Sequence, residues 1–118
     1  MAVDIEAAQH YHRARTTKRF QLREAERHQW LQRTRDAVAL LAPRFPAVHQ
    51  VVIFGSLVKP GRFGESSDID IAVVCDSVAV ESAFWRALEQ ALSRSVDLRP
   101  LTGALTDVVN REGERVYG

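Results

Sequence analysis

The chain lacks the features that mark several specialised protein classes. It has one cysteine, Cys75, among 118 residues, which excludes a disulfide framework and a cysteine-based zinc site. Its apolar runs, such as 51–54 and 71–75, are far shorter than the roughly 20 residues that cross a membrane, so we predict no membrane span. The segment from Met1 to Glu6 has neither the basic nor the apolar stretch of a secretory signal. We therefore expect a cytoplasmic protein.

Turn-forming residues are missing from the first part of the chain. No glycine precedes Gly55, and the first proline is Pro43. Strong helix formers dominate from Ile5 to Leu41. This composition predicts one long helix that ends near Leu41, because Pro43 and Pro46 stop it.

The net charge of +1 conceals an uneven distribution. Residues 1–47 carry nine basic and five acidic side chains, whereas residues 48–118 carry seven and ten. Between Arg13 and Arg35 there are eight basic residues and only two acidic ones, Glu24 and Glu26. Such a helix can bind an acidic protein or nucleic acid, or it can simply present a solvated face.

The rest of the chain predicts short strands alternating with helices. The expected elements are a strand at 51–54, a turn or loop over 56–66, a strand at 68–75, a helix at 80–92, a strand at 96–101 and a helix at 104–112. This order predicts an α/β (α+β) fold in which helices flank a small β-sheet. We divide the chain into an N-terminal helical extension, residues 1–47, and a core, residues 48–118.

Two aspartates follow one another in the predicted strand at 68–75. Asp68 and Asp70 are two positions apart, so they share one face of the strand. Two neighbouring carboxylates repel each other, and burying them unpaired is costly. A divalent cation resolves the conflict, since Mg²⁺ prefers carboxylate oxygens together with substrate phosphates.

A glycine–serine pair and a third aspartate complete the candidate site. Gly55 permits a tight turn and close backbone approach at the end of the first strand, and Ser56 adds a hydroxyl donor for a phosphate. Asp97 alternates with apolar residues in the strand at 96–101. If this strand lies beside the preceding one, three carboxylates converge, as in sites where two cations about 3.5–4 Å apart support displacement at phosphorus. The alternative is that Asp97 pairs with Arg99, which shares its face.

In these motifs the chain resembles the minimal nucleotidyltransferase (MNT) family of the DNA polymerase β-like superfamily. The matching segments are Val52-Ile53-Phe54-Gly55-Ser56-Leu57, Ser67-Asp68-Ile69-Asp70-Ile71-Ala72-Val73 and Val96-Asp97-Leu98, with Glu112-Gly113 and Val116-Tyr117 near the C-terminus. The resemblance implies a small mixed sheet flanked by helices, with residues 48–118 as the nucleotidyltransferase core. It also implies that Asp68 and Asp70 bind both metals and that Asp97 is the third ligand and activates the attacking hydroxyl.

The same resemblance implies the substrates. Gly55 and Ser56 would hold the triphosphate of an NTP, most often ATP, with two Mg²⁺ ions for which Mn²⁺ can substitute. The family often has arginine in a Gly-Ser-x-Ala-Arg-Gly pattern, and here Lys59 keeps the charge without the bidentate fork. The partner in such families is a small helical HEPN-type toxin that an MNT-type antitoxin adenylylates.

We therefore expect a metal-dependent nucleotidyltransferase that moves AMP from ATP to a hydroxyl, on a partner protein. Two alternatives remain: an antitoxin of weak activity that neutralises a HEPN-type toxin by binding alone, and a nucleic-acid-binding accessory protein that uses the basic helix. The same helix is also a candidate surface for homo-oligomerisation. We expect no membrane partner.

Overall fold

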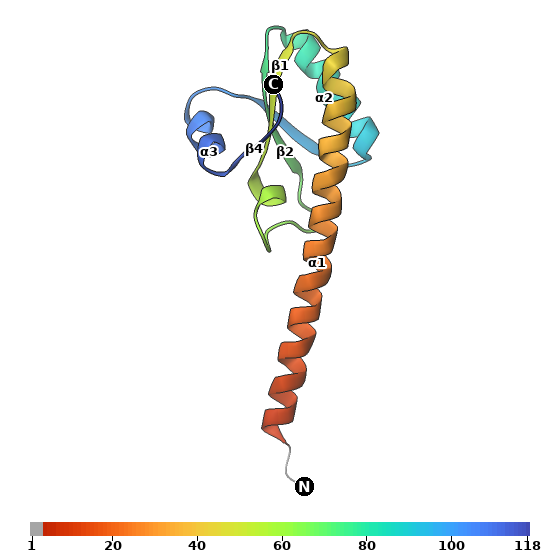
Figure 1. Cartoon of the computed structure of the whole chain (residues 1–118), viewed down its shortest axis with the longest axis vertical. Coiled ribbons are helices and arrows are strands. Elements are labelled where there is room, and N and C mark those ends of the chain that lie inside the picture. The colour runs from red at the N-terminus through yellow and green to blue at the C-terminus, as the bar shows by residue number, and fades with distance from the viewer. Residues whose placement is uncertain (1–3) are drawn as a thin grey trace.

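A single long helix, α1, leads the computed structural model, which describes residues 4–118 (Figure 1). It runs from Ile5 to Leu41 as predicted, and the carboxylate of Asp4 caps it by accepting a hydrogen bond of 3.0 Å from the amide of Ala7. A short 3-10 helix, Ala42–Arg44, follows at Pro43. The proline therefore ends the α-helix where the sequence indicates.

The sheet has four strands in the order β3-β2-β1-β4. β1 pairs antiparallel with β2 and with β4, whereas β2 and β3 are parallel, so the sheet is mixed as the resemblance implies. The bounds are Val48–Phe54 for β1, Ile69–Cys75 for β2, Val96–Pro100 for β3 and Glu114–Tyr117 for β4. Helix α2, Val78–Leu92, connects β2 to β3, and α3, Ala104–Glu112, connects β3 to β4. The predicted fold class is confirmed.

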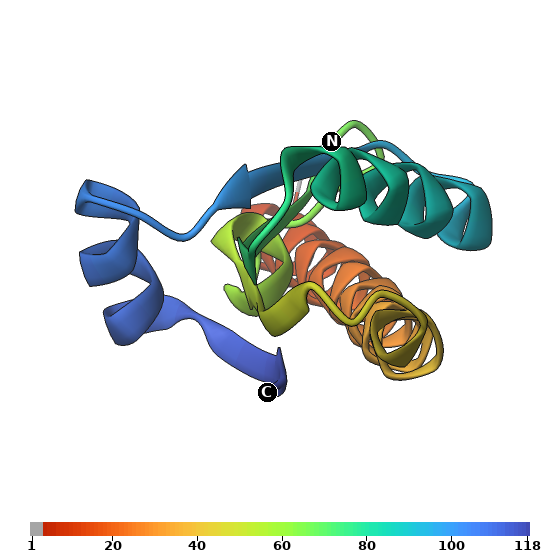
Figure 2. The same ribbon diagram turned by 90° about the horizontal axis from the view of Figure 1, so that it is seen from above.

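Strand alternation divides the sheet into two unlike faces. One face carries Val51, Ile53 and Ile71 and is covered by α1 and α2, which form the main core. The other face carries Val52, Phe54 and Ala72 and packs against Val109 of α3 in a much smaller cluster. Figure 2 shows α3 on the side of the sheet opposite to α1 and α2. Because α3 is short, much of the second face is left for a functional site.

Helix α1 has two parts with different surroundings. Its C-terminal half packs on the rest of the domain through Arg27, Leu31, Thr34 and Val38, which are buried. Every residue from Asp4 to Arg23 is exposed. The helix therefore projects from the domain and gives the chain its extents of 71 × 28 × 19 Å (Figure 1). The division at residue 47 stays a prediction.

Strand β4 is an element that the sequence pattern did not predict. Its residues, Glu114–Tyr117, alternate only weakly and include two charged side chains. The strand exists because its backbone pairs with β1, a partner some 60 residues earlier in the chain.

None of the helices over residues 4–118 is both long enough and apolar enough to cross a membrane.

Candidate active site

The predicted carboxylates lie on the sheet face that α3 only partly covers. Ile69 and Ile71 point into the main core, so Asp70 between them points to the opposite face, together with Ala72. Val96 and Leu98 are likewise buried in the main core, and Asp97 between them shares the face of Asp70. The alternation that builds the core thus places both acids outside it.

Asp70 and Asp97 occupy paired positions of the parallel strands β2 and β3. On its other side Asp70 pairs with Phe54, the last residue of β1. Gly55 follows with φ +73°, and a Cβ atom built on it would lie 3.0 Å from Cγ and 3.2 Å from Cβ of Asp70, and closer still to Oδ2. Gly55 is therefore required both by its left-handed backbone and by the carboxylate packed against it.

The surroundings of Asp70 oppose its negative charge. Burial raises the pKa of the Asp70 carboxyl, and the charges of Asp97 and Asp68 raise it further, whereas Arg99 lowers it. Asp68 itself is exposed and lies one residue before β2. The site consequently has excess negative potential that a cation would relieve.

Asp97 is held by an arginine on its own strand. Its carboxylate accepts hydrogen bonds from Nε and Nη2 of Arg99, the shortest of 2.9 Å from Nη2 to Oδ2. These bonds raise the pKa of the Arg99 guanidinium. The pairing that the sequence left as an alternative is thus present in the structure.

The ability of these acids to bind metal depends on that ion pair. Over residues 4–118, no three His, Cys, Asp or Glu side chains are grouped closely enough to hold a metal ion as they stand. The donor set nevertheless fits Mg²⁺, because Asp70 and Asp97 supply carboxylate oxygens from neighbouring strands and Asp70 is destabilised when charged. A cation at Asp97 would compete with Arg99 for the same carboxylate. Metal ligation by Asp68, Asp70 and Asp97 remains a prediction.

The predicted phosphate-binding residues lie on the turn after β1. Residues Gly55–Val58 form a 3-10 turn, labelled η2 in chain order, in agreement with the turn expected there. Ser56 and Lys59 line a hollow of about 370 Å³ together with Arg62. Lys59 also forms an ion pair of 2.8 Å with Glu112, at the end of α3.

Arg62 is a candidate that the sequence interpretation missed. A turn brings it back beside Lys59, with a hydrogen bond of 3.2 Å from the Arg62 amide to the Lys59 carbonyl oxygen. Arg62 offers the guanidinium fork that Lys59 lacks. The signal was the Pro60-Gly61 pair, which marks a turn and so places the residues on either side of it close together.

Two buried or half-buried arginines fix the loops around the site. Arg27 of α1 donates to the carbonyl oxygen of Leu57 in η2 at 3.0 Å and pairs with Glu24 at 2.7 Å. Glu24 in turn accepts a hydrogen bond of 2.5 Å from the Gly61 amide. These bonds attach η2 and the turn at Gly61 to α1.

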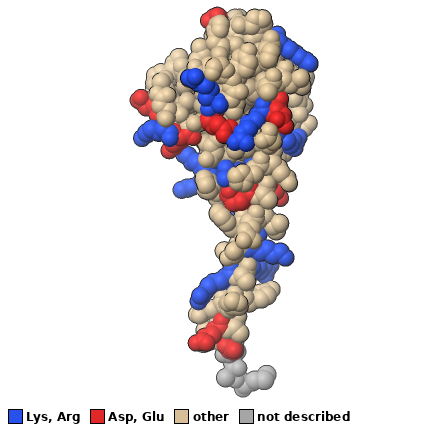
Figure 3. Space-filling model, in the orientation of Figure 1, with Lys and Arg blue, Asp and Glu red and all other residues tan. Residues whose placement is uncertain are grey.

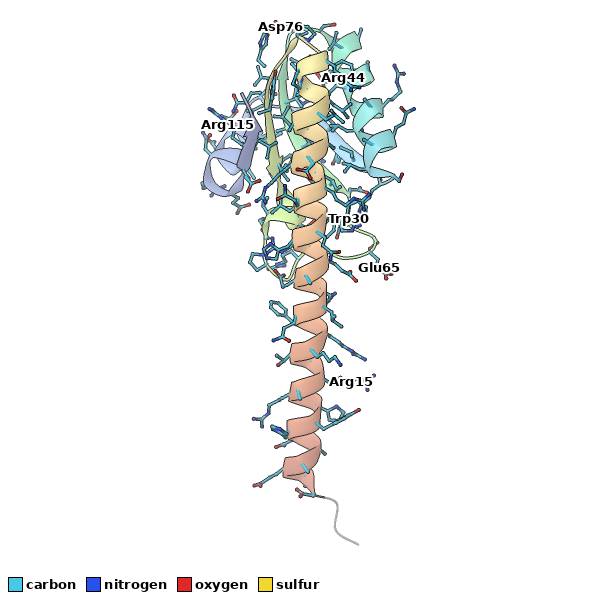
Figure 4. The ribbon with its side chains drawn as sticks, turned by 45° about the vertical axis from the view of Figure 1, so that its right-hand side comes forward. Arg15, Trp30, Arg44, Glu65, Asp76 and Arg115 are labelled. Atoms are coloured by element: carbon cyan, nitrogen blue, oxygen red, sulfur yellow. The ribbon has the colours of Figure 1, made fainter. Side chains whose placement is uncertain are left out.

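Arg94 fixes the loop that precedes Asp68 by hydrogen bonds to its backbone. Its Nη2 donates to the carbonyl oxygens of Gly64 at 2.6 Å and Ser67 at 2.8 Å, and its guanidinium stacks on the rings of Trp30 and Phe63. Arg94, Trp30 and Phe63 border a cavity of about 640 Å³, which Glu65 also lines. Figure 4 shows Trp30 on α1 and Glu65 in the loop. Burial lowers the pKa of Arg94, whereas the charge of Asp68 raises it.

Comparison with known protein families identifies the family to which the chain belongs. Residues 37–118 match the family described as Polymerase beta, Nucleotidyltransferase, which covers more than half of the chain. The chain belongs to the polymerase β nucleotidyltransferase family. The matched range includes all of the candidate site and excludes the projecting part of α1. A comparison with curated proteins gave no match.

Solved structures similar to this nucleotidyltransferase-family chain include toxin–antitoxin complexes. A double mutant of an MntA–HpeT complex, with two aspartates two positions apart changed to glutamate, has a TM-score of 0.59 and 26% identity over 72% of this chain and 73% of that one. A toxin–antitoxin structure with AMP-PNP has a TM-score of 0.58 and 28% identity over 71% and 73%.

A third structure adds a modified partner. It is a tri-AMPylated HEPN toxin of Shewanella oneidensis in complex with an MNT antitoxin, with a TM-score of 0.52 and 25% identity over 75% of this chain and 72% of that one. The resemblance to MNT proteins drawn from the sequence motifs is confirmed.

Proposed function

We propose that this chain transfers AMP from ATP to a hydroxyl group on a HEPN-type partner protein and acts as the antitoxin of a toxin–antitoxin pair. The observation that carries the proposal is the pairing of Asp70 with Asp97 on adjacent strands, beside a turn whose glycine packs against Asp70. The AMP-PNP complex and the AMPylated toxin among the similar structures support it.

The residues of the site would divide the work. Asp68, Asp70 and Asp97 would hold two Mg²⁺ ions, or Mn²⁺ in their place. Bound there, the cations would neutralise charge on the triphosphate and on the departing pyrophosphate. Lys59 and Arg62, which border the hollow beside Ser56, would bind the triphosphate oxygens.

The transfer itself needs a proton acceptor. Asp97, released from Arg99, would accept the proton of the attacking hydroxyl. The hydroxyl oxygen then forms a bond to the α-phosphorus, the bond from that phosphorus to the bridging oxygen breaks, and pyrophosphate leaves. Arg99, the residue that pairs with Asp97 in the structure, would remain nearby as a counter-charge.

A transfer assay tests this proposal. The purified chain is incubated with ATP labelled on the adenosine moiety, Mg²⁺ and a HEPN-type partner, and label on the partner is measured. Asp70→Asn should lower the rate by at least about a hundredfold, because it removes the charge at the reaction centre. Its thermal transition should not fall, since burial of the charge is relieved. The matched control Asp36→Asn, on the exposed side of α1, should keep full transfer. Normal transfer by Asp70→Asn refutes the assignment.

Neutralisation by binding alone is the second candidate. The observation that favours it is the Asp97–Arg99 ion pair, which occupies the proposed proton acceptor. If Asp70→Asn still protects cells from the toxin without labelling it, contact is sufficient. If protection and labelling are lost together, transfer is the function.

A further inference from the structure

The projecting part of α1 carries an organised face that its own domain does not use. Tyr11, Arg15, Lys18 and Leu22 are spaced by four, three and four residues, so at 100° per residue they lie within an arc of about 60°. This is the spacing of the seam positions in a coiled coil. Tyr11 is 61% exposed and Leu22 57% exposed. We call these four residues the outer seam.

The outer seam points away from the sheet. Leu31 and Val38, which pack on the sheet, lie about 180–200° around the helix from Tyr11 by the same geometry. The seam is therefore no continuation of the stripe that packs in the core, and nothing within residues 4–118 covers it. We call the exposed part of α1, residues 5–23, the shaft. Figure 4 shows Arg15 on it, beyond the domain.

The basic residues of α1 divide into two groups in the structure. Arg27 and Arg35 form ion pairs within the fold, with Glu24 and Glu114. In the part of the chain described, Arg15 and Lys18 form no ion pair, and no acidic side chain occurs from residue 7 to residue 23. Figure 3 shows Lys and Arg along the shaft and Asp and Glu at its tip.

The exposed part of α1 would gain stability if a partner packed on it. An isolated helix of about 20 residues that packs on nothing is marginal in water. Among residues 4–118, seven large apolar side chains are exposed, and four of them lie on this shaft: Ile5, Tyr11, Phe20 and Leu22. The shaft also lies outside the matched family range, residues 37–118.

We propose that the outer seam binds an acidic amphipathic helix of a partner protein. The seam spacing selects a helix, Tyr11 and Leu22 supply apolar contacts at its two ends, and Arg15 and Lys18 between them require Asp or Glu opposite. A second copy of this chain does not fit, because pairing two such seams places basic residues against basic residues. A nucleic acid does not fit either, because phosphates leave Leu22 uncovered.

Peptide binding by the full chain tests the proposal. The probe is a synthetic helix of about three heptads. It has leucine at the positions that would face Tyr11 and Leu22 and glutamate at the positions that would face Arg15 and Lys18. Binding is followed by fluorescence anisotropy. Arg15→Glu should weaken binding at least about tenfold through like-charge repulsion. Leu22→Ala should weaken it as well. A probe with lysine at the central positions should bind Arg15→Glu better than it binds the unmodified chain.

Arg13→Glu is the matched control. Arg13 is equally exposed but lies about 160° around the helix from Arg15, so this variant should bind the acidic probe normally. Equal losses in Arg13→Glu and Arg15→Glu, or no saturable binding, would overturn the proposal. It also fails if the chain sediments as a dimer that Arg15→Glu dissociates, or if a DNA duplex binds more tightly than the probe. Circular dichroism confirms that each variant stays helical.

Discussion

Gly55 has two roles in the structure: its backbone adopts a positive φ, and its lack of a side chain makes room for Asp70. Gly55→Ala tests both. The residue adopts φ +73°, which costs a residue with a Cβ roughly 1–2 kcal/mol. The new methyl group would also lie 3.0 Å from Cγ of Asp70, well inside the 3.5–4.0 Å at which carbon atoms attract each other. The Asp70 side chain must therefore move. The variant should lose both stability and transfer.

Two other glycines isolate the contributions. Gly103 has φ +56° but nothing within 4 Å of the position that a Cβ atom would take, and Gly64 has neither a positive φ nor a close neighbour. Gly103 has ψ −133°, outside the left-handed helical region, so Gly103→Ala should lose about 1–3 kcal/mol from backbone strain alone. Gly64→Ala should be near neutral or slightly stabilising. Any entropy gain from removing a glycine in the unfolded chain is common to all three variants and cancels in the comparison.

Urea unfolding and the AMP-transfer assay together give the answer. Gly55→Ala should be the least stable of the three and the only one that loses transfer, because only there does the methyl group displace Asp70. The interpretation is refuted if Gly55→Ala matches Gly103→Ala in stability and retains transfer. In that case the packing of Gly55 against Asp70 has no part in the chemistry.

Two further predictions concern arginines that join separate elements. Arg94→Lys should raise the Mg²⁺ concentration needed for half-maximal transfer, because lysine cannot bond all the loop carbonyls that position Asp68. Arg33→Lys, which alters a guanidinium that does not touch this loop, should leave that concentration unchanged, and equal shifts would contradict the positioning role. A hydrogen bond from Arg35 lowers the pKa of Glu114 in the folded protein. The pair therefore stabilises the fold fully at pH values above the pKa of Glu114 in the unfolded chain. This stabilisation is lost as the pH falls through the lower pKa of Glu114 in the folded protein. Glu114→Gln should therefore cost up to about 1 kcal/mol at pH 7, since the pair is partly exposed. This deficit should shrink as pH falls, and a deficit that does not shrink would contradict the stabilising role of the pair.

The local elements of this chain were readable from its sequence because their causes are local. The absence of glycine and proline before Pro43 specifies α1, and Pro43 specifies its end. The alternation Ile69-Asp70-Ile71 specifies which side chains leave the core, since neighbouring strand residues face opposite ways. The family motifs therefore pointed to the fold correctly.

The tertiary structure decided which groups meet across the chain. β4 is a strand only because β1 offers it an edge. Lys59 bonds Glu112, a contact that depends on where α3 lies. The Asp97–Arg99 pair, in contrast, is local to one strand, and the sequence already offered it as an alternative. Arg62 joins the site because a turn folds it back.

Helix α1 shows most clearly which properties the sequence determines and which depend on the tertiary structure. Composition alone gave one run of positive charge from Arg13 to Arg35. The fold uses Arg27 and Arg35 for internal ion pairs and leaves Arg15 and its neighbours on a shaft beyond the sheet. Charge and helical period are properties of the sequence, whereas exposure depends on where the sheet ends, and only the packed structure determines that.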